Sequence, residues 1–317
     1  MPCCLESNRE LIIDMKNDVD QNPKFKASDI TVVVSTHSSD VFEKCVRSVY
    51  NQRPREIILI LDDPDEKTEK AAESLKGISR IVKTRKSMFI SKTRNLGIKL
   101  SKTPLIAFLD GDCIPTRNWI KQILRAFQFG DIVYGKRLSY LKKGNWREVR
   151  YRARSGKYAE KRIRVFTKDN MQDMYLISGQ NLACKRSLVD NFKFGGDQDW
   201  QKGGEDVDFQ FWSIGRGYKC VFNPKMIVIH HHPQSLFKHF KKAIDYGFAD
   251  GFLFQRHPEV KQNKWFNNYT PNLLHSVSLL DFNLFLADLF DYMGTKIGRL
   301  LFRFYKIKRH MKGKEKI

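Results

Sequence analysis

From residue 30 to residue 127 the chain alternates short apolar segments with segments of helical periodicity, and this alternation constrains the fold more than any other feature. Continuous apolar runs predict buried strands at residues 30–35, 57–61, 81–82 and 105–109. Apolar residues at helical spacing predict helices at residues 41–50, 65–75, 90–100 and 119–127. Strands joined by helices form right-handed crossovers, so we expect an α/β fold with a mostly parallel, Rossmann-like central sheet flanked by helices.

The chain divides into three predicted regions. Residues 1–28 are polar and aperiodic, which is typical of a flexible leader. Residues 29–235 fit one large domain. It begins with the alternating strands and helices, and it continues with a core-like segment at 175–179, a helix at 207–214 and strands near 221 and 227–229. Residues 236–317 form a basic C-terminal helical extension, in which residues 273–305 place apolar side chains at helical spacing.

Basic residues outnumber acidic ones, with 57 Lys and Arg against 35 Asp and Glu and a net charge of +22. This excess predicts an anionic partner, which is a phosphorylated substrate, an acidic membrane surface or nucleic acid. Nucleic acid is the weakest of the three, because the sequence has no zinc finger, RNA-recognition aromatic motif or helix-turn-helix signal. Residues 136–168 form a basic block that either holds phosphate groups or is a solvated basic face.

The cysteines and the apolar runs bear on location. Six scattered cysteines and an N-terminus without a cationic start and apolar core favour a cytoplasmic protein. No uninterrupted apolar run reaches the roughly 18 to 20 residues that span a bilayer. The amphipathic C-terminal segment with its basic tail predicts either a peripheral helix on the inner face of a membrane or a helix packed on the core.

Two carboxylates, Asp110 and Asp112, directly follow the apolar run at residues 105–109 and flank Gly111. Ligands bind at the carboxyl ends of strands in α/β sheets. Glycine allows a tight bend and a close approach, and paired carboxylate oxygens suit Mg²⁺ or Mn²⁺. The same three residues are also typical of a simple turn.

Three further polar clusters follow predicted strands or begin a predicted helix. Asp62 and Asp63 end the second strand and suit either a nucleoside contact or a helix-entry turn. The acidic start at residues 205–208 follows two glycines and suits either a general base or helix capping. Three consecutive histidines at residues 230–232 follow an apolar strand and suit either a metal ligand or polar packing.

In this order and spacing the motifs resemble those of the family 2 glycosyltransferases of the GT-A fold. The resemblance covers most of the chain from Ile30 to His232. It departs at Pro64, where the family more often has glycine. The matching segments are residues 34–38, 45–52, 61–64, 92–98, 108–112, 178–183 and 204–206.

The resemblance implies a role for each residue of the nucleotide site. Asp63 would bind the base in a pocket lined by Thr36 and His37. Arg94 would support the nucleotide site, and Asp110 would contact ribose or metal-bound water.

The resemblance also implies the metal and acceptor residues. Asp112 would be the direct ligand of Mn²⁺ or Mg²⁺, helped by one histidine of 230–232, of which we favour His230 because it directly follows the strand. Asp206 would be the catalytic base, with Glu205 beside it positioning acceptor or sugar. The loop that borders the acceptor would consist of Gly179, Gln180 and Asn181.

The implied activity is metal-assisted, inverting transfer of a hexosyl or N-acetylhexosaminyl group from a nucleotide sugar, with a UDP-sugar favoured, to a hydroxyl of a lipid-linked or glycan acceptor. One alternative is a nucleotidyltransferase of related fold, although residues 35–39 lack the expected phosphate-binding Gly and basic residues. A second alternative is a non-catalytic basic protein that binds nucleic acid or anionic lipid.

Overall fold

The structure is a computed structural model that describes residues 12–13, 24–140, 160–196, 203–231, 236–264, 266 and 282–314. Its strands form one mixed sheet in the order β1-β8-β10-β7-β9-β5-β2-β3-β4, with β6 paired to β10. The strands are β1 (Ile12–Ile13), β2 (Ile30–Thr36), β3 (Glu56–Asp62), β4 (Arg80–Thr84), β5 (Leu105–Asp110), β6 (Cys113–Pro115), β7 (Ile132–Ser139), β8 (Ile163–Phe166), β9 (Asn181–Lys185) and β10 (Cys220–His230).

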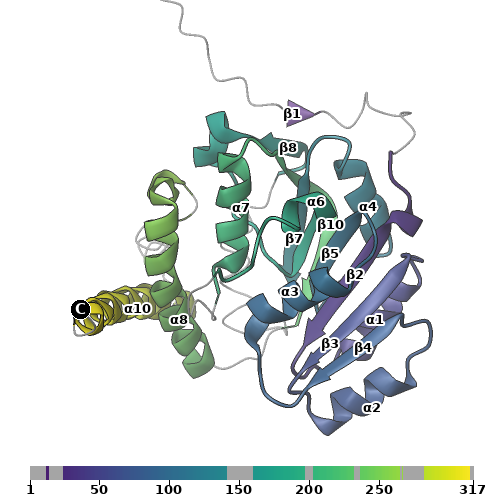
Figure 1. Ribbon diagram of the computed structural model, residues 1–317, viewed down its shortest axis with the longest axis horizontal. Helices are drawn as coiled ribbons and strands as arrows, with labels where there is room; N and C mark the ends of the chain where they lie inside the picture. The colour runs from purple at the N-terminus through teal and green to yellow at the C-terminus, as the bar shows by residue number, and fades with distance from the viewer. Residues whose placement is uncertain are drawn as a thin grey trace, which may run out of the picture.

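Helices cover both faces of this sheet, as Figure 1 shows, with α1, α2 and α4 on one side and α3 and α7 on the other. The α-helices are α1 (Phe42–Tyr50), α2 (Glu66–Ser74), α3 (Phe89–Leu100), α4 (Trp119–Ala126), α6 (Arg186–Val189), α7 (Glu205–Gly215), α8 (Leu236–Arg256) and α10 (Phe282–Lys314). Short 3-10 helices span Ala27–Asp29, Lys168–Asp173 and Pro258–Gln262.

The parallel half of the sheet has the architecture that the alternation predicts. Strand β2 lies between β3 and β5 and is parallel to both, and β3 is parallel to β4. Every residue of β2 is buried, and alternate side chains enter different cores: Val33 joins one apolar cluster, while Val32 and Val34 join the other. Burial on both faces explains why these strands read as continuous apolar runs.

The second half of the sheet contains strands that the sequence patterns do not predict. Strand β9 lies antiparallel between β5 and β7, so the residues that precede Asn181 reach the carboxyl end of β5, where Leu109 is its partner. Strand β10 pairs with β6 in the register His230 to Cys113. These two pairings bring distant parts of the chain to the edge where β5 ends.

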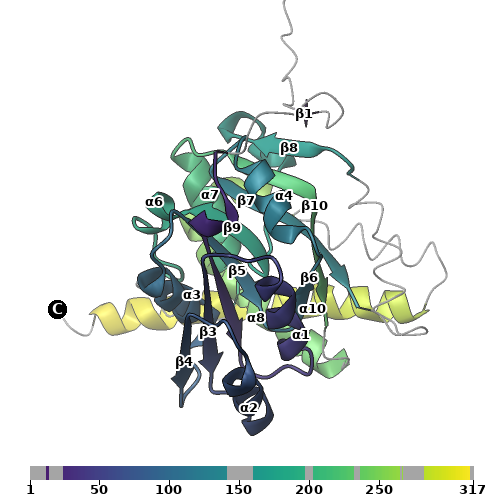
Figure 2. The ribbon, with the colours of Figure 1, turned by 90° about the vertical axis from the view of Figure 1, so that its right-hand side faces the viewer.

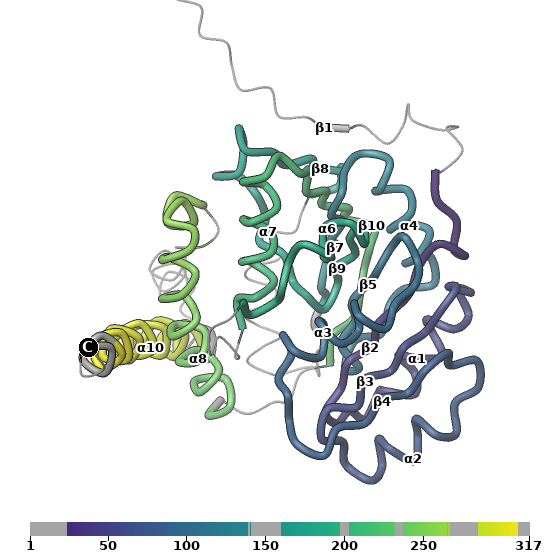
Figure 3. The backbone as a smooth tube through the Cα atoms, viewed as in Figure 1, coloured from purple at the N-terminus to yellow at the C-terminus, as the bar shows by residue number. Residues whose placement is uncertain are grey.

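Helices α8 and α10 pack closely against each other and against the domain. Figure 2 shows α10 crossing the width of the molecule, and the tube in Figure 3 shows α8 between α7 and α10. A Cβ atom at Gly247 would collide with the backbone of Thr295, and one at Gly298 would collide with the backbone of Ile244. Asp250 on α8 pairs with Arg299 on α10 at 2.8 Å.

The C-terminal helices are part of the main apolar core, because Phe252, Leu253 and Phe302 belong to the same cluster as Val33. Residues 273–281 of the predicted amphipathic segment at residues 273–305 lie outside the described residues. Within the described part of the chain, no helix is both long enough and apolar enough to cross a bilayer.

We expect Gly247→Ala to lower the free energy of unfolding by about 1–3 kcal/mol, because the added methyl group overpacks the contact between α8 and α10. Denaturant titration would measure the change. Gly215→Ala is the matched control, since a Cβ there meets no atom within 4 Å and alanine favours the helix. Equal stability of the two variants would contradict the close packing of the helix pair.

Candidate active site

The carboxyl end of β5 meets the end of β10 at a cluster of three candidate metal ligands. Asp112, Cys113 and His230 each offer one donor atom, and these atoms lie within 4.8 Å of one another. The closest pair is Asp112 Oδ2 and His230 Nε2, 3.0 Å apart. The antiparallel pairing of β6 with β10 produces this approach, because it sets His230 opposite Cys113.

The donor set fits Mn²⁺ or Mg²⁺ at Asp112 and His230. Two ligand atoms in neighbouring octahedral positions, each about 2.1 Å from the ion, lie about 3.0 Å apart, which matches the carboxylate and imidazole separation. Burial, reinforced by the negative charge of Asp112, raises the pKa of the Cys113 thiol well above its usual range. The thiol donates a hydrogen bond to Asp112 Oδ1 at 3.4 Å.

The neighbouring histidines have other surroundings. The ring of His231 stacks on Tyr140 with centroids 4.3 Å apart, and its backbone N–H donates to the carbonyl oxygen of Asp112 at 2.8 Å. His232 lies outside the described residues. Of the two described histidines, His230 is therefore the one whose side chain contacts the Asp112 carboxylate.

Gly111 allows the turn between the two carboxylates to lie close to β2. Its N–H donates to the carbonyl oxygen of Ser35 at 2.8 Å. A Cβ atom at this position would lie 2.6 Å from Cβ of Thr36 and 3.0 Å from the ring of Phe42. Thr36, predicted to line the nucleotide pocket, is 8% exposed and packs against this turn.

The two aspartates at the end of β3 have different environments. The carboxylate of Asp62 accepts hydrogen bonds from Thr84 Oγ1, Ser87 Oγ and the N–H of Met88. Asp63 is exposed and has a left-handed backbone conformation, with φ of 55°. His37 is also exposed, and its Nδ1 lies 2.8 Å from the carbonyl oxygen of Asp62. The satisfied carboxylate of Asp62 holds the loop, so Asp63 and His37 are the groups available to a ligand.

Arg94 connects the end of β5, next to the candidate metal ligands (an edge of the sheet that we call the metal edge), to the start of α7. Its guanidinium group is 3% exposed, pairs with Glu205 and lies 4.0 Å from Asp110 Oδ1. A Cβ atom at Gly179 would collide with this group, so the loop before β9 passes directly over it. Glu205, expected to position acceptor or sugar, is buried, and the contact that the structure gives it is the ion pair with Arg94.

Asp206 lies beside this ion pair at the N-terminus of α7. Its Oδ2 accepts from the N–H of Gly179 at 2.8 Å, and its Oδ1 accepts from the N–H of Val207 at 2.9 Å. The two hydrogen bonds orient a half-buried carboxylate, and the helix dipole stabilises its charge.

The two residues after Gly179 have different surroundings: Gln180 lies beside the candidate metal ligands, whereas Asn181 is buried between strands. Gln180 Nε2 lies 3.2 Å from His230 Nε2, and Gln180 Oε1 accepts from Arg137 at 3.1 Å. Asn181, predicted on the acceptor side, has no exposed surface and bonds to Trp119 Nε1 and to two backbone carbonyls. These hydrogen bonds give Asn181 a structural role that holds neighbouring strands together. A side chain with no exposed surface does not reach an acceptor.

Lys242 on α8 is a charged neighbour of the site that the sequence patterns did not identify. Burial raises the pKa of Asp110 to about 6, and the positive charges of Arg94 and Lys242 oppose the rise. Lys242 also opposes the rise that burial causes in the pKa of Asp112. No local motif marks this lysine, because it comes to the site only through the packing of α8.

We expect the affinity for Mn²⁺ to fall as the pH decreases through about 6. The raised pKa means that Asp110 is ionised above about pH 6 and protonated below it, so affinity falls about tenfold by pH 5. Calorimetric titration of the full chain at pH 7.5 and pH 5 measures this. Asp110→Asn should show a smaller change, and equal affinity of the unaltered chain at both pH values would contradict the prediction.

Comparison with known structures identifies the fold. The chain is similar in structure to a mannosyltransferase, PcManGT from Pyrobaculum calidifontis, in complex with GDP-Man and Mn²⁺, with a TM-score of 0.59 and 15% identity over 89% of this chain and 90% of that one. It is also similar to S. aureus TarS 1-349 in complex with UDP-GlcNAc, with a TM-score of 0.52 and 12% identity over 88% and 92% of the two chains. The fold is therefore that of the GT-A glycosyltransferases, as the motifs predicted.

The family follows from sequence. Residues 31–190, about half of the chain, match the profile of glycosyl transferase family 2, and the chain belongs to that family. A curated relative, the pre-mycofactocin glycosyltransferase of Mycobacterium tuberculosis, is 26% identical over 210 residues, which make up 65% of this chain. The matched segment spans 41% of that relative's length.

Proposed function

We propose that the protein transfers a sugar from a nucleotide sugar to an acceptor hydroxyl by a metal-assisted, inverting displacement. The observation that carries the proposal is the loop before β9. Its Gly179 N–H holds Asp206, and its Gln180 side chain contacts His230, which contacts Asp112. One short loop thus sets a candidate base beside a candidate metal site, which suits a reaction with a base and an anionic leaving group.

The donor is a nucleotide sugar, with a uridine nucleotide favoured. Support comes from the two structural neighbours, whose complexes contain GDP-Man and UDP-GlcNAc. The exposed carboxylate of Asp63 has free acceptor capacity for a base N–H such as N3–H of uracil. Family membership favours transfer of a glycosyl group over transfer of a nucleotidyl group, which was the enzymatic alternative.

In the proposed reaction the acceptor oxygen forms a bond to the anomeric carbon while the bond from that carbon to the diphosphate oxygen breaks. The Asp206 carboxylate takes the proton of the acceptor hydroxyl, and its two backbone hydrogen bonds keep it oriented. A single displacement inverts the anomeric centre. Mn²⁺ or Mg²⁺ held by Asp112 and His230 would stabilise the negative charge of the leaving diphosphate.

Cations of this chain also face the leaving group in the proposal. Arg137 lies 3.1 Å from Gln180, and the charge of Lys242 acts on both Asp110 and Asp112. Arg137 belongs to the basic block at residues 136–168, whose residues 141–159 lie outside the described residues, and Lys242 adds a cation from α8. The acceptor in this proposal is a lipid-linked molecule or a glycan, and the four described cysteines, all free and buried, are compatible with a cytoplasmic reaction.

Asp206→Asn should lower the transfer rate by about 10²–10⁴-fold, because an amide does not accept the proton, while the fold and donor binding remain. The rate is measured with Mn²⁺ and the nucleotide sugar that stabilises the chain in a thermal-shift series, and circular dichroism checks the fold. Glu73→Gln, an exposed carboxylate on α2, is the control and should retain full activity. Full activity of Asp206→Asn would remove the proposed base.

The donor class can be found without knowing the acceptor. We expect UDP-sugars to raise the melting temperature of the full chain when Mn²⁺ is present, and to do so much less for Asp112→Asn, because Asp112 would hold the ion that favours binding of the diphosphate. A thermal-shift series with UDP-GlcNAc, UDP-glucose and GDP-mannose measures this. Stabilisation by GDP-mannose alone would overturn the uridine preference, and stabilisation by none would overturn the donor proposal.

A further inference from the structure

Helix α10 exposes a stripe of large apolar side chains, which we call the α10 stripe. Each of its members is between 37% and 59% exposed. Their spacing along the helix is four, three, one, three and three residues, so they share one face. The members of the α10 stripe are Met293, Ile297, Leu300, Leu301, Phe304 and Ile307.

The opposite face of α10 is already occupied. Gly294 and Gly298 approach Ala243 and Ile244 of α8 closely, and Phe302 is buried in the main core. The α10 stripe is therefore a second apolar face, additional to the one that holds the helix on the domain. A folded chain gains nothing from six exposed apolar side chains in water, so the stripe suits a partner outside the domain.

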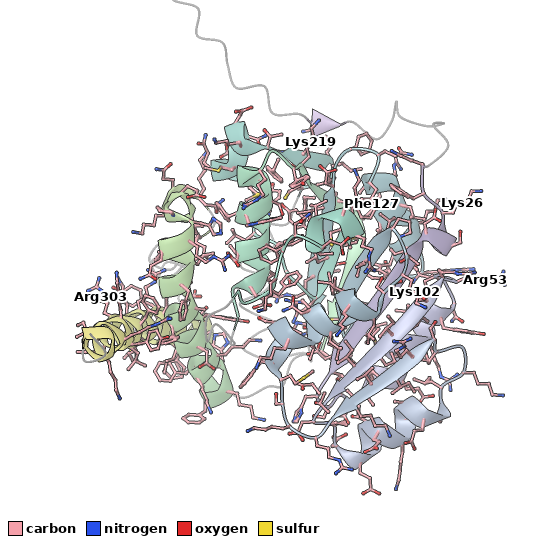
Figure 4. The ribbon with its side chains drawn as sticks, viewed as in Figure 1. Lys26, Arg53, Lys102, Phe127, Lys219 and Arg303 are labelled. Atoms are coloured by element: carbon pink, nitrogen blue, oxygen red, sulfur yellow. The ribbon has the colours of Figure 1, made fainter. Side chains whose placement is uncertain are left out.

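The charges around the stripe are of one sign. From Tyr292 to Lys314 the chain has no acidic residue. Lys296 and Arg303 are exposed beside the stripe, and Figure 4 shows Arg303 on the side of α10 that faces away from the sheet. The cations of this stretch are Lys296, Arg299, Arg303, Lys306, Lys308, Arg309, Lys312 and Lys314.

We propose that α10 lies along the surface of an anionic lipid bilayer, with the α10 stripe inserted at the boundary between headgroups and acyl chains. A helix with one apolar face and basic flanks binds in this orientation, and cations near an anionic leaflet add to the affinity. A bilayer fits better than a second copy of the chain, because pairing two α10 stripes would bring two sets of cations together. The absence of a described helix able to cross a bilayer agrees with a helix that lies on the surface.

The close contact between α8 and α10 connects this surface to the candidate active site. Gly247 of α8 lies against Thr295 of α10, and Lys242 on the same α8 acts on Asp110. A bilayer bound at the α10 stripe would therefore hold the site at a set distance from the lipid. The inference itself rests on α10 alone, so it stands or falls separately from the proposed reaction.

Flotation of the full chain with vesicles tests the inference. We expect binding to phosphatidylcholine vesicles containing phosphatidylserine, much weaker binding to phosphatidylcholine alone, and loss of binding as salt is raised. Phe304→Ser should weaken binding to the anionic vesicles about tenfold. Tyr50→Ser is the matched control, because Tyr50 is an aromatic residue on α1 with 49% exposure, against 59% for Phe304.

A second variant tests the charge contribution. Arg303→Gln should weaken binding to anionic vesicles about fivefold while circular dichroism and the melting temperature stay unchanged, since the side chain is exposed. The proposal is overturned by no binding to anionic vesicles at low salt, by equal binding of Phe304→Ser and the unaltered chain, or by equal binding to neutral vesicles. A dimer that Phe304→Ser dissociates in analytical ultracentrifugation would show that a second copy covers the stripe, which also overturns it.

Discussion

The buried guanidinium group of Arg94 is the interaction on which the arrangement of the site depends. It projects from α3 and meets Glu205 at the start of α7 and Asp110 at the end of β5, and it leaves room only for glycine at position 179. A buried charge without a partner is very costly, so these contacts must form together. Because each partner belongs to a different element, the pairing sets the loop before β9 and the start of α7 relative to the parallel sheet.

The balance of charge around the metal edge follows from that arrangement. Glu205, Asp110 and Asp206 lie near Arg94. Lys242 of α8 and Arg137 of β7 are the cations near Asp112. Withdrawal from water opposes ionisation of Asp110, whereas the cations favour it. In the proposed reaction, the opposite charges of a divalent ion and a diphosphate would largely cancel, so the net charge of the site would change little when both bind.

The sequence predicted the parallel half of the fold well and the other half poorly. Every strand and helix predicted between residues 30 and 127 overlaps an observed element, with ends that agree to within two residues. Strands β7, β8 and β9 were not predicted, and helix α8 was predicted only as part of the helical extension at residues 236–317, without bounds of its own. Strand β7 was missed because Lys136 and Arg137 give its sequence the composition of a basic loop. Position 135 requires glycine because the irregular part of strand β10 passes close to it, which only the tertiary structure shows.

The same division holds for the site and for α10. The sequence by itself determined the α/β class, the family, the carboxylates at strand ends and the two-faced character of the C-terminal helix, because these follow from local patterns and ordered motifs. Only the tertiary structure decided that His230 faces Asp112, that Asn181 is buried, that Lys242 acts on the metal edge and which face of α10 is exposed. Each of these depends on the register or packing of residues far apart in the chain, for which no local pattern carries a signal.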